Sequence, residues 1–113
     1  MDLIEKEISA FKNEVFLSEE EREEFKSVED KYLNSECEAL VEYLLNLRNN
    51  AGQKVELGQQ ENIFFSEAFH YVYFEKGRFY DIRGGFDCIA DLIEGLDYFS
   101  CEEEVAVRFL SSF

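Results

Sequence analysis

The sequence predicts an α+β fold for one compact acidic domain over residues 1–113: N-terminal helices, a meander of two or three antiparallel strands, then C-terminal helices. Apolar residues recur at helical spacing in the first half and again towards the C-terminus. Between them, residues 62–83 are dense in Ile, Val, Phe and Tyr, which favour strands. The 12 Phe and 6 Tyr predict a packed core despite a net charge of −15.

Three helices are predicted in the first half, over residues 3–15, 19–33 and 36–49. The first has one apolar stripe at helical spacing, made of Ile4, Ile8, Phe11 and Val15. Asp2 and Glu5 provide its N-terminal cap, and Ser18 and Glu21 form a capping box at the start of the second helix. The apolar phase changes near Asn34, so we expect a break or kink there.

The meander is predicted over residues 62–83. Residues 70–74 and 78–82 flank a tight turn and predict a hairpin, and residues 63–65 are a candidate third strand. With a two-residue loop, the strands have two apolar faces. One face carries Tyr71, Tyr73, Tyr80 and Ile82, and the other carries Val72, Phe74 and Phe79. We expect one face to pack on the helices and the other to need a cover or a partner.

Two C-terminal helices are predicted, over residues 86–99 and 101–111. Gly84 and Gly85 form the preceding turn, and the first helix has a broad apolar arc: Phe86, Ile89, Leu92, Ile93, Leu96 and Phe99. Ser100 and Glu103 form a further capping box. A strand over residues 105–110 is the alternative for the last segment.

The acidic surface is the first candidate site, because solubility alone needs a net charge of only about 2–8. Acidic and aromatic residues recur along one side of the predicted helix 86–99: Asp87, Asp91, Glu94 and Tyr98, with Asp97 beside them. Such a row of carboxylates resembles a run of phosphates in sign and spacing. The alternative is a solvated helix face. The run Glu19–Glu24 is assigned to helix capping and the helix dipole.

The tyrosines of the hairpin are the second candidate surface. Tyr71, Tyr73 and Tyr80 on one face form an amphipathic patch of the kind enriched at protein interfaces. Strands also favour Tyr, so a core role is the alternative interpretation.

The cysteines and the histidine are assigned structural roles. Cys37, Cys88 and Cys101 are odd in number and have no metal-ligand spacing, which indicates reduced cytoplasmic thiols. Cys37 lies among apolar residues and suits a small core position. His70 lies beside strand aromatics, and no local pattern supports a nucleophile pair with Cys88 or Cys101. We expect no cofactor, no metal and, without a leader or an apolar span, no membrane.

Three classes of function remain. The first is a non-enzymatic inhibitor that occludes a basic nuclease, toxin or nucleic-acid-binding complex. Immunity proteins, antitoxins and phage inhibitors of restriction or CRISPR systems belong to this DNA-mimic-like class. It would act as a monomer or homodimer, and the charge disfavours direct nucleic-acid binding. The second is a module that self-associates through the aromatic hairpin. A small enzyme is the third, without a located site.

Overall fold

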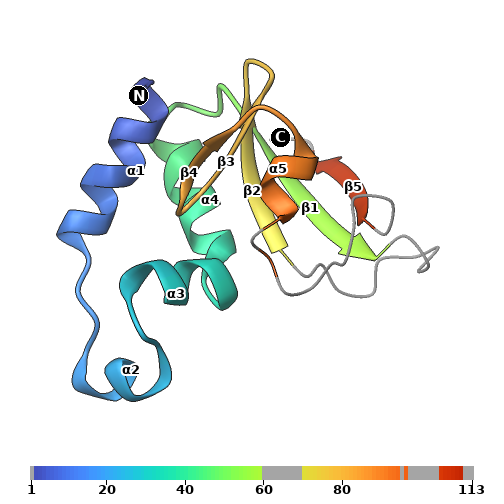
Figure 1. Ribbon diagram of the computed structural model, residues 1–113. Coiled ribbons are helices and arrows are strands. Elements are labelled where there is room, and N and C mark those ends of the chain that lie inside the picture. Colours follow the sequence, from blue (N-terminus) through green and yellow to red (C-terminus); the bar gives the residue numbers. More distant parts are fainter. Residues whose placement is uncertain (1, 60–69, 95, 97–104, 111–113) are drawn as a thin grey trace.

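The structure is a computed structural model that describes residues 2–59, 70–94, 96 and 105–110. Its helices are α1 (Leu3–Glu14), α2 (Glu19–Glu24), α3 (Val28–Asn34), α4 (Cys37–Leu47) and α5 (Ile89–Ile93). Its strands are β1 (Gln53–Gln59), β2 (His70–Glu75), β3 (Arg78–Asp81), β4 (Gly84–Phe86) and β5 (Val105–Leu110). The strands form one antiparallel sheet in the order β4-β3-β2-β1-β5. Helices α1 and α4 pack on one face of this sheet and α5 on the other (Figure 1).

The N-terminal helices follow their capping signals. Asp2 and Glu5 form the capping box of α1, and α3 ends at Asn34, where a break was predicted. The predicted helix 19–33 is wrong, because two helices, α2 and α3, occupy this region. Ser27 is extended and its side chain accepts a hydrogen bond from the Asp30 N–H, so it caps a new helix inside the predicted one.

The hairpin of β2 and β3 is present, with Tyr73 opposite Tyr80. Lys76 and Gly77 form its two-residue turn with φ of 51° and 80°, both in the left-handed region that twisted hairpins favour. The two predicted faces are also present. Tyr73 and Tyr80 pack with α1 and α4, whereas Val72 packs with α5.

The predicted meander of two or three strands is wrong, because the hairpin lies within a five-stranded sheet. The missed strand β1 pairs with β2 and alternates buried Val55 and Leu57 with Lys54 and Glu56. Strand β4 occupies the position of the predicted glycine turn and pairs with β3. Residues 63–65, the predicted third strand, lie outside the described residues.

The predicted C-terminal helices 86–99 and 101–111 are also wrong. Phe86 belongs to β4, so the helix that follows begins only after Cys88, and α5 is five residues long. Residues 105–110 form the strand β5 at the sheet edge, which was the alternative. The β-branched and aromatic side chains of Val105, Val107 and Phe109 suit a strand at this position. The predicted capping box at Ser100 lies outside the described residues.

The core has one apolar cluster on each face of the sheet. On the first face, Ile4 and Ile8 of α1 and Leu44 of α4 are buried against the hairpin. On the second face, Leu92 and Leu96 are buried against β1 and β2. The face that was expected to need a cover or a partner is therefore covered in part by α5. Among the described residues, no helix has the length and apolarity needed to cross a membrane.

Candidate functional site

The predicted carboxylate row is only partly visible in the structure. Asp91 lies on α5 and Glu94 caps its C-terminal end, and both side chains are exposed. Neither forms an ion pair with a described residue. Asp87 precedes the helix, while Asp97 and Tyr98 lie outside the described residues. Because α5 is so short, the described part of the chain does not carry the continuous row on which the prediction depended.

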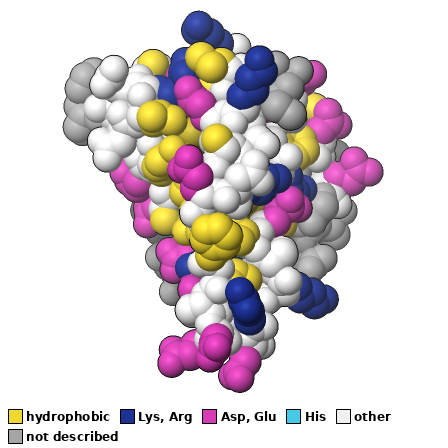
Figure 2. Space-filling model, turned by 90° about the vertical axis from the view of Figure 1, so that its left-hand side faces the viewer, with side chains coloured by type: hydrophobic (Ala, Val, Ile, Leu, Met, Phe, Trp, Pro, Cys, Tyr) yellow, Lys and Arg dark blue, Asp and Glu magenta, His cyan; other side chains and the backbone are white. Residues whose placement is uncertain are grey.

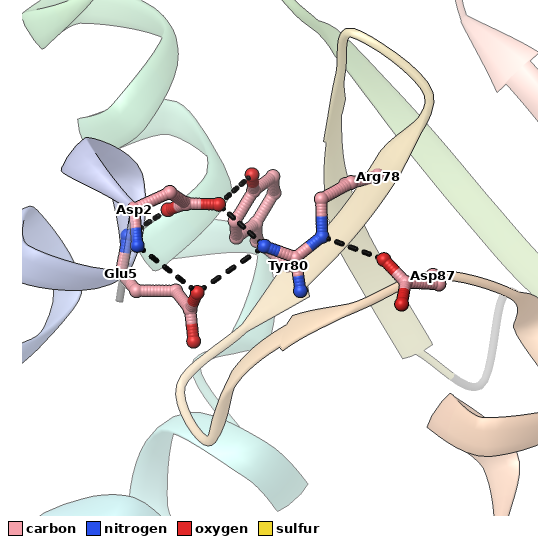
Figure 3. A network of polar contacts seen from close by, with 5 residues as sticks. All are labelled: Asp2, Glu5, Arg78, Tyr80 and Asp87. Atoms are coloured by element: carbon pink, nitrogen blue, oxygen red, sulfur yellow. Dashed lines mark hydrogen bonds and ion pairs between the residues drawn. The ribbon is translucent and has the colours of Figure 1, made fainter.

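Asp87 belongs to a polar network that joins the start of α1 to β3 (Figure 3). The Arg78 Nε donates to the Asp87 Oδ1 over 2.9 Å, and its Nη1 donates to Glu5 Oε1 over 3.2 Å and to Asp2. The Tyr80 hydroxyl donates to the Asp2 Oδ2 over 2.6 Å. Part of the charge assigned to partner binding therefore holds the hairpin to the first helix.

The hairpin tyrosines lie under the helices. Tyr73 and Tyr80 are 0% and 3% exposed, and Tyr71 is half-buried. Burial and the neighbouring carboxylates, Glu75 for Tyr73 and Asp2 for Tyr80, raise the pKa of both phenols. These two rings are core residues in this structure and do not present a surface to a partner.

Most basic side chains are likewise bound by carboxylates within the fold. The further pairs are Arg48 with Glu7 and Glu75, Lys54 with Glu38 and Glu42, Arg83 with Asp81, Arg108 with Glu56, Lys12 with Glu29, and Lys31 with Glu21. The charge of these acids is therefore partly neutralised by basic side chains of the same chain.

Helix α2 carries the densest group of unpaired acids among the described residues. Glu19, Glu20, Glu23 and Glu24 are exposed and form no ion pair there, and no residue of α2 is buried. Figure 1 shows α2 at the lower end of the molecule, away from the sheet. Figure 2 shows acidic side chains gathered at the lower end of the face that bears α1 and α2. We call these four carboxylates with Phe16, which is 79% exposed just before the helix, the α2 knob.

Helix stability explains only part of this acidity. Glu21 completes the capping box with Ser18, and its hydrogen bonds to Lys31 and to the Ser18 N–H lower its pKa to about 2. Glu19 and Glu20 in the first turn suit the helix dipole. Glu23 and Glu24 lie in the last turn, where the dipole disfavours negative charge. The whole run was assigned to helix capping and the helix dipole, but the boundaries of α2 do not support that assignment for Glu23 and Glu24.

A second cluster lies at the start of β2, on the sheet face that also carries Val72, and includes His70, which is 0% exposed. The Nε2 of His70 is 3.4 Å from the Oδ2 of Asp81, and its Nδ1 is buried without a hydrogen-bond partner in the described chain. Arg83 binds the Asp81 carboxylate through Nε and Nη2, and Nη2 also donates to the Leu92 carbonyl over 2.7 Å. Cys37, the first residue of α4, lies beside the imidazole and is half-buried.

Burial alone would raise the pKa of the Cys37 thiol. The neighbouring His70 side chain and the backbone N–H groups of Tyr71 and Glu38 outweigh it, so the pKa of the thiol lies below its ordinary value. Burial would likewise lower the pKa of His70, but Asp81 and Cys37 outweigh it and raise that pKa. Each of the two side chains therefore favours the charged form of the other.

This cluster was not predicted from the sequence, because Cys37 was assigned to the core and His70 was considered only with Cys88 or Cys101. The sequence did contain one indication that His70 and Asp81 lie close together. A two-residue hairpin turn with Tyr73 opposite Tyr80 puts His70 and Asp81 on the same face, as diagonal neighbours on adjacent strands. The described residues contain no group of three or more ligands able to hold a metal ion.

No family model, curated protein or solved structure matches this chain. Its function has to be inferred from its own residues.

Proposed function

We propose that this chain is a small, acidic, non-enzymatic inhibitor that binds a basic partner protein and occludes its functional surface. The partner is a nuclease, a toxin or another nucleic-acid-binding complex. The α2 knob carries the proposal, because its carboxylates form no ion pair with a described residue and the stability of α2 does not explain Glu23 and Glu24. Asp91 and Glu94 on α5 form a second acidic patch on another part of the molecule (Figure 1).

The chemistry of the knob fits a basic protein surface. The knob combines carboxylates, which offer charge complementarity, with an exposed aromatic ring, which offers an apolar anchor. The net charge of −15 speeds the encounter with a basic surface and makes the association rate fall as salt rises. A DNA-binding groove is a surface of this kind. The proposal places the protein in the cytoplasm, where the thiols of Cys37 and Cys88 stay reduced.

Affinity capture from the natural source, with partners identified by mass spectrometry, tests the proposal. Capture is run at low and high salt with the wild type, with Glu20→Lys/Glu23→Lys and with Asp91→Lys/Glu94→Lys. We expect one basic partner that is lost as salt rises and is lost with the α2 variant. Equal capture by the α2 variant and the wild type would show that the α2 knob is not part of the interface.

A second candidate function is a structural or adaptor module that self-associates through the aromatic hairpin. The edge strand β5 supports it, because Phe109 is 46% exposed and packs edge-on against Phe74 of β2, with ring centroids 5.0 Å apart. An exposed apolar edge strand is a template for pairing between chains. This candidate requires an oligomer that persists at high salt, whereas the inhibitor is a monomer or homodimer. Sedimentation at low and high salt distinguishes the two.

A further inference from the structure

Helix α2 needs an anchor to keep a fixed position on the molecule. It is six residues long and none of its residues is buried. Isolated helices shorter than about 12 residues are marginal in water. Among the ion pairs of the described residues, one joins α2 to another element, and it links Glu21 to Lys31 of α3. This pair is therefore the polar link that can orient the α2 knob.

Glu21 lies on a different side of α2 from the acids of the knob. At 3.6 residues per turn, successive side chains are about 100° apart around the helix axis. Glu21 is thus opposite Glu19 and Glu23, and Glu20 and Glu24 lie between these two positions. Glu21 is half-buried, whereas the other four side chains are exposed. When Glu21 is bound to α3, the four unpaired carboxylates are turned outwards together.

Lys31 is itself held in the packed part of the fold. Its side chain is 17% exposed, and its ammonium lies 5.4 Å from the centroid of the Tyr32 ring. Tyr32 packs edge-on against Phe11 of α1, with ring centroids 4.9 Å apart. Phe11 in turn contacts Tyr43 of α4. These rings join α3 to α1 and α4, so the ion pair attaches α2 to a part of the molecule that three helices build.

We propose that Lys31 is the positioning residue of the α2 knob: its ion pair with Glu21 holds the four unpaired carboxylates on one outward face, which meets the basic partner. This inference rests on the proposed function and gives Lys31 no contact with the partner. A surface that is already ordered loses less conformational freedom on binding than one that must first be ordered. Lys31 therefore favours the complex although its own positive charge repels a basic protein.

The sign of the effect on binding separates positioning from simple electrostatics. Lys31→Met removes a positive charge from a chain of net charge −15, so electrostatics alone predicts faster association with a basic partner. Loss of positioning predicts weaker binding. Lys12→Met is the matched control, because it removes the same charge and breaks the ion pair of Lys12 with Glu29 of α3, which does not involve α2. Lys31→Arg keeps the charge and should behave as the wild type.

Hydrogen exchange, followed by NMR on the full chain at constant pH, tests the anchor without a partner. The probes are the amides of Arg22 and Phe25, whose hydrogen bonds close the first and last turns of α2. We expect Lys31→Met to speed their exchange about two- to fivefold, and Lys31→Arg and Lys12→Met to change it less than about 1.5-fold. Unchanged exchange in Lys31→Met would overturn the proposal, and so would an equal increase throughout the chain, which would indicate a role in overall stability only.

Affinity for the partner identified by capture completes the test. We expect Lys31→Met to bind about two- to fivefold more weakly than the wild type, and Lys12→Met to bind at least as tightly as the wild type. If Lys31→Met binds as tightly as Lys12→Met, Lys31 does not position the knob for binding. Wild-type affinity in Glu20→Lys/Glu23→Lys would instead contradict the role of the knob itself, so failure of the proposed function is distinguishable from failure of this inference.

Discussion

Tyr80 donates its phenolic hydrogen to Asp2 Oδ2 over 2.6 Å, which joins β3 to the N-cap of the first helix, 78 residues earlier in the chain. The same carboxylate caps α1 by accepting from the Glu5 N–H over 2.8 Å and binds Arg78. One acidic side chain thus starts a helix and fastens it to the sheet (Figure 3). The pairing explains how so acidic a chain keeps a compact fold.

Removing this phenol should destabilise the protein. Tyr80→Phe leaves the ring in the core but removes a hydrogen bond to a charged carboxylate, which typically contributes about 1.5–3 kcal/mol. We expect urea unfolding to show a loss of that order. Tyr71→Phe is the matched control, because the Tyr71 hydroxyl has no hydrogen bond with a described residue, and it should change the unfolding free energy by less than about 0.5 kcal/mol. Equal losses in both variants would contradict the role given to Asp2.

Arg83 should contribute more to the stability of the fold than the Tyr80 hydroxyl does. Its guanidinium neutralises Asp81, whose side chain is 1% exposed, so Arg83→Met leaves a buried carboxylate with its main positive charge removed. Breaking a buried pair on one side costs about 3–5 kcal/mol. Methionine keeps an apolar stem near Phe86, which lies under the guanidinium. Arg22→Met on α2 is the exposed control, and thermal unfolding of the two variants measures the difference.

Stability should be greatest on the mildly acidic side of neutrality. The Arg48 guanidinium lowers the pKa of Glu75. Burial would raise the pKa of Asp81, but His70 and Arg83 outweigh burial and lower it. The contribution of these two carboxylates to stability is therefore present above about pH 4 and is lost as the pH falls further. The pKa of His70 is raised above 6.5, so its contribution is full below that value and is lost as the pH rises through the folded-state value.

Urea unfolding from about pH 3 to about pH 9 measures this dependence. High-salt buffer screens the repulsion among surface carboxylates, which would otherwise also change with pH. The expected optimum lies between about pH 5 and 6.5. An unfolding free energy that rises steadily to pH 8 would contradict the raised pKa of His70.

Charge reversal on α2 should separate binding from folding. Glu20→Lys/Glu23→Lys changes side chains without ion pairs among the described residues, so the unfolding free energy should change by less than about 0.5 kcal/mol. Binding to the captured partner should weaken at least tenfold, mainly through slower association. Surface plasmon resonance gives both rates, and Asp91→Lys/Glu94→Lys tests the α5 patch separately. Unchanged rates in the α2 variant would contradict the proposed interface.

The sequence predicts those parts of the fold whose signals are local. The capping box of Asp2 and Glu5 places α1, and the two-residue turn places the hairpin register. Strand β1 was missed because Lys54 and Glu56 alternate with Val55 and Leu57, and charged residues have low strand propensity. Residues 105–110 were misassigned because the apolar pattern of so short a segment fits a helix as well as a strand. Pairing with β1 decides in favour of the strand.

The candidate sites depend still more on tertiary structure. The sequence shows which residues are acidic, but only the fold shows which of them are paired. Asp87 forms an ion pair with Arg78, whereas Glu23 forms none with a described residue. Cys37 and His70 are far apart in the chain, and only the fold brings α4 near β2. No spacing rule connects them, so residue type alone could not identify the pair.

The most direct test of the central claim is competition between this chain and nucleic acid for the captured partner. Fluorescence anisotropy of a labelled duplex bound to the partner is followed while the chain is added. The wild type should displace the duplex to completion, and Glu20→Lys/Glu23→Lys should do so only at much higher concentration. A ternary complex in which the duplex stays bound at saturating chain would contradict occlusion by a carboxylate surface.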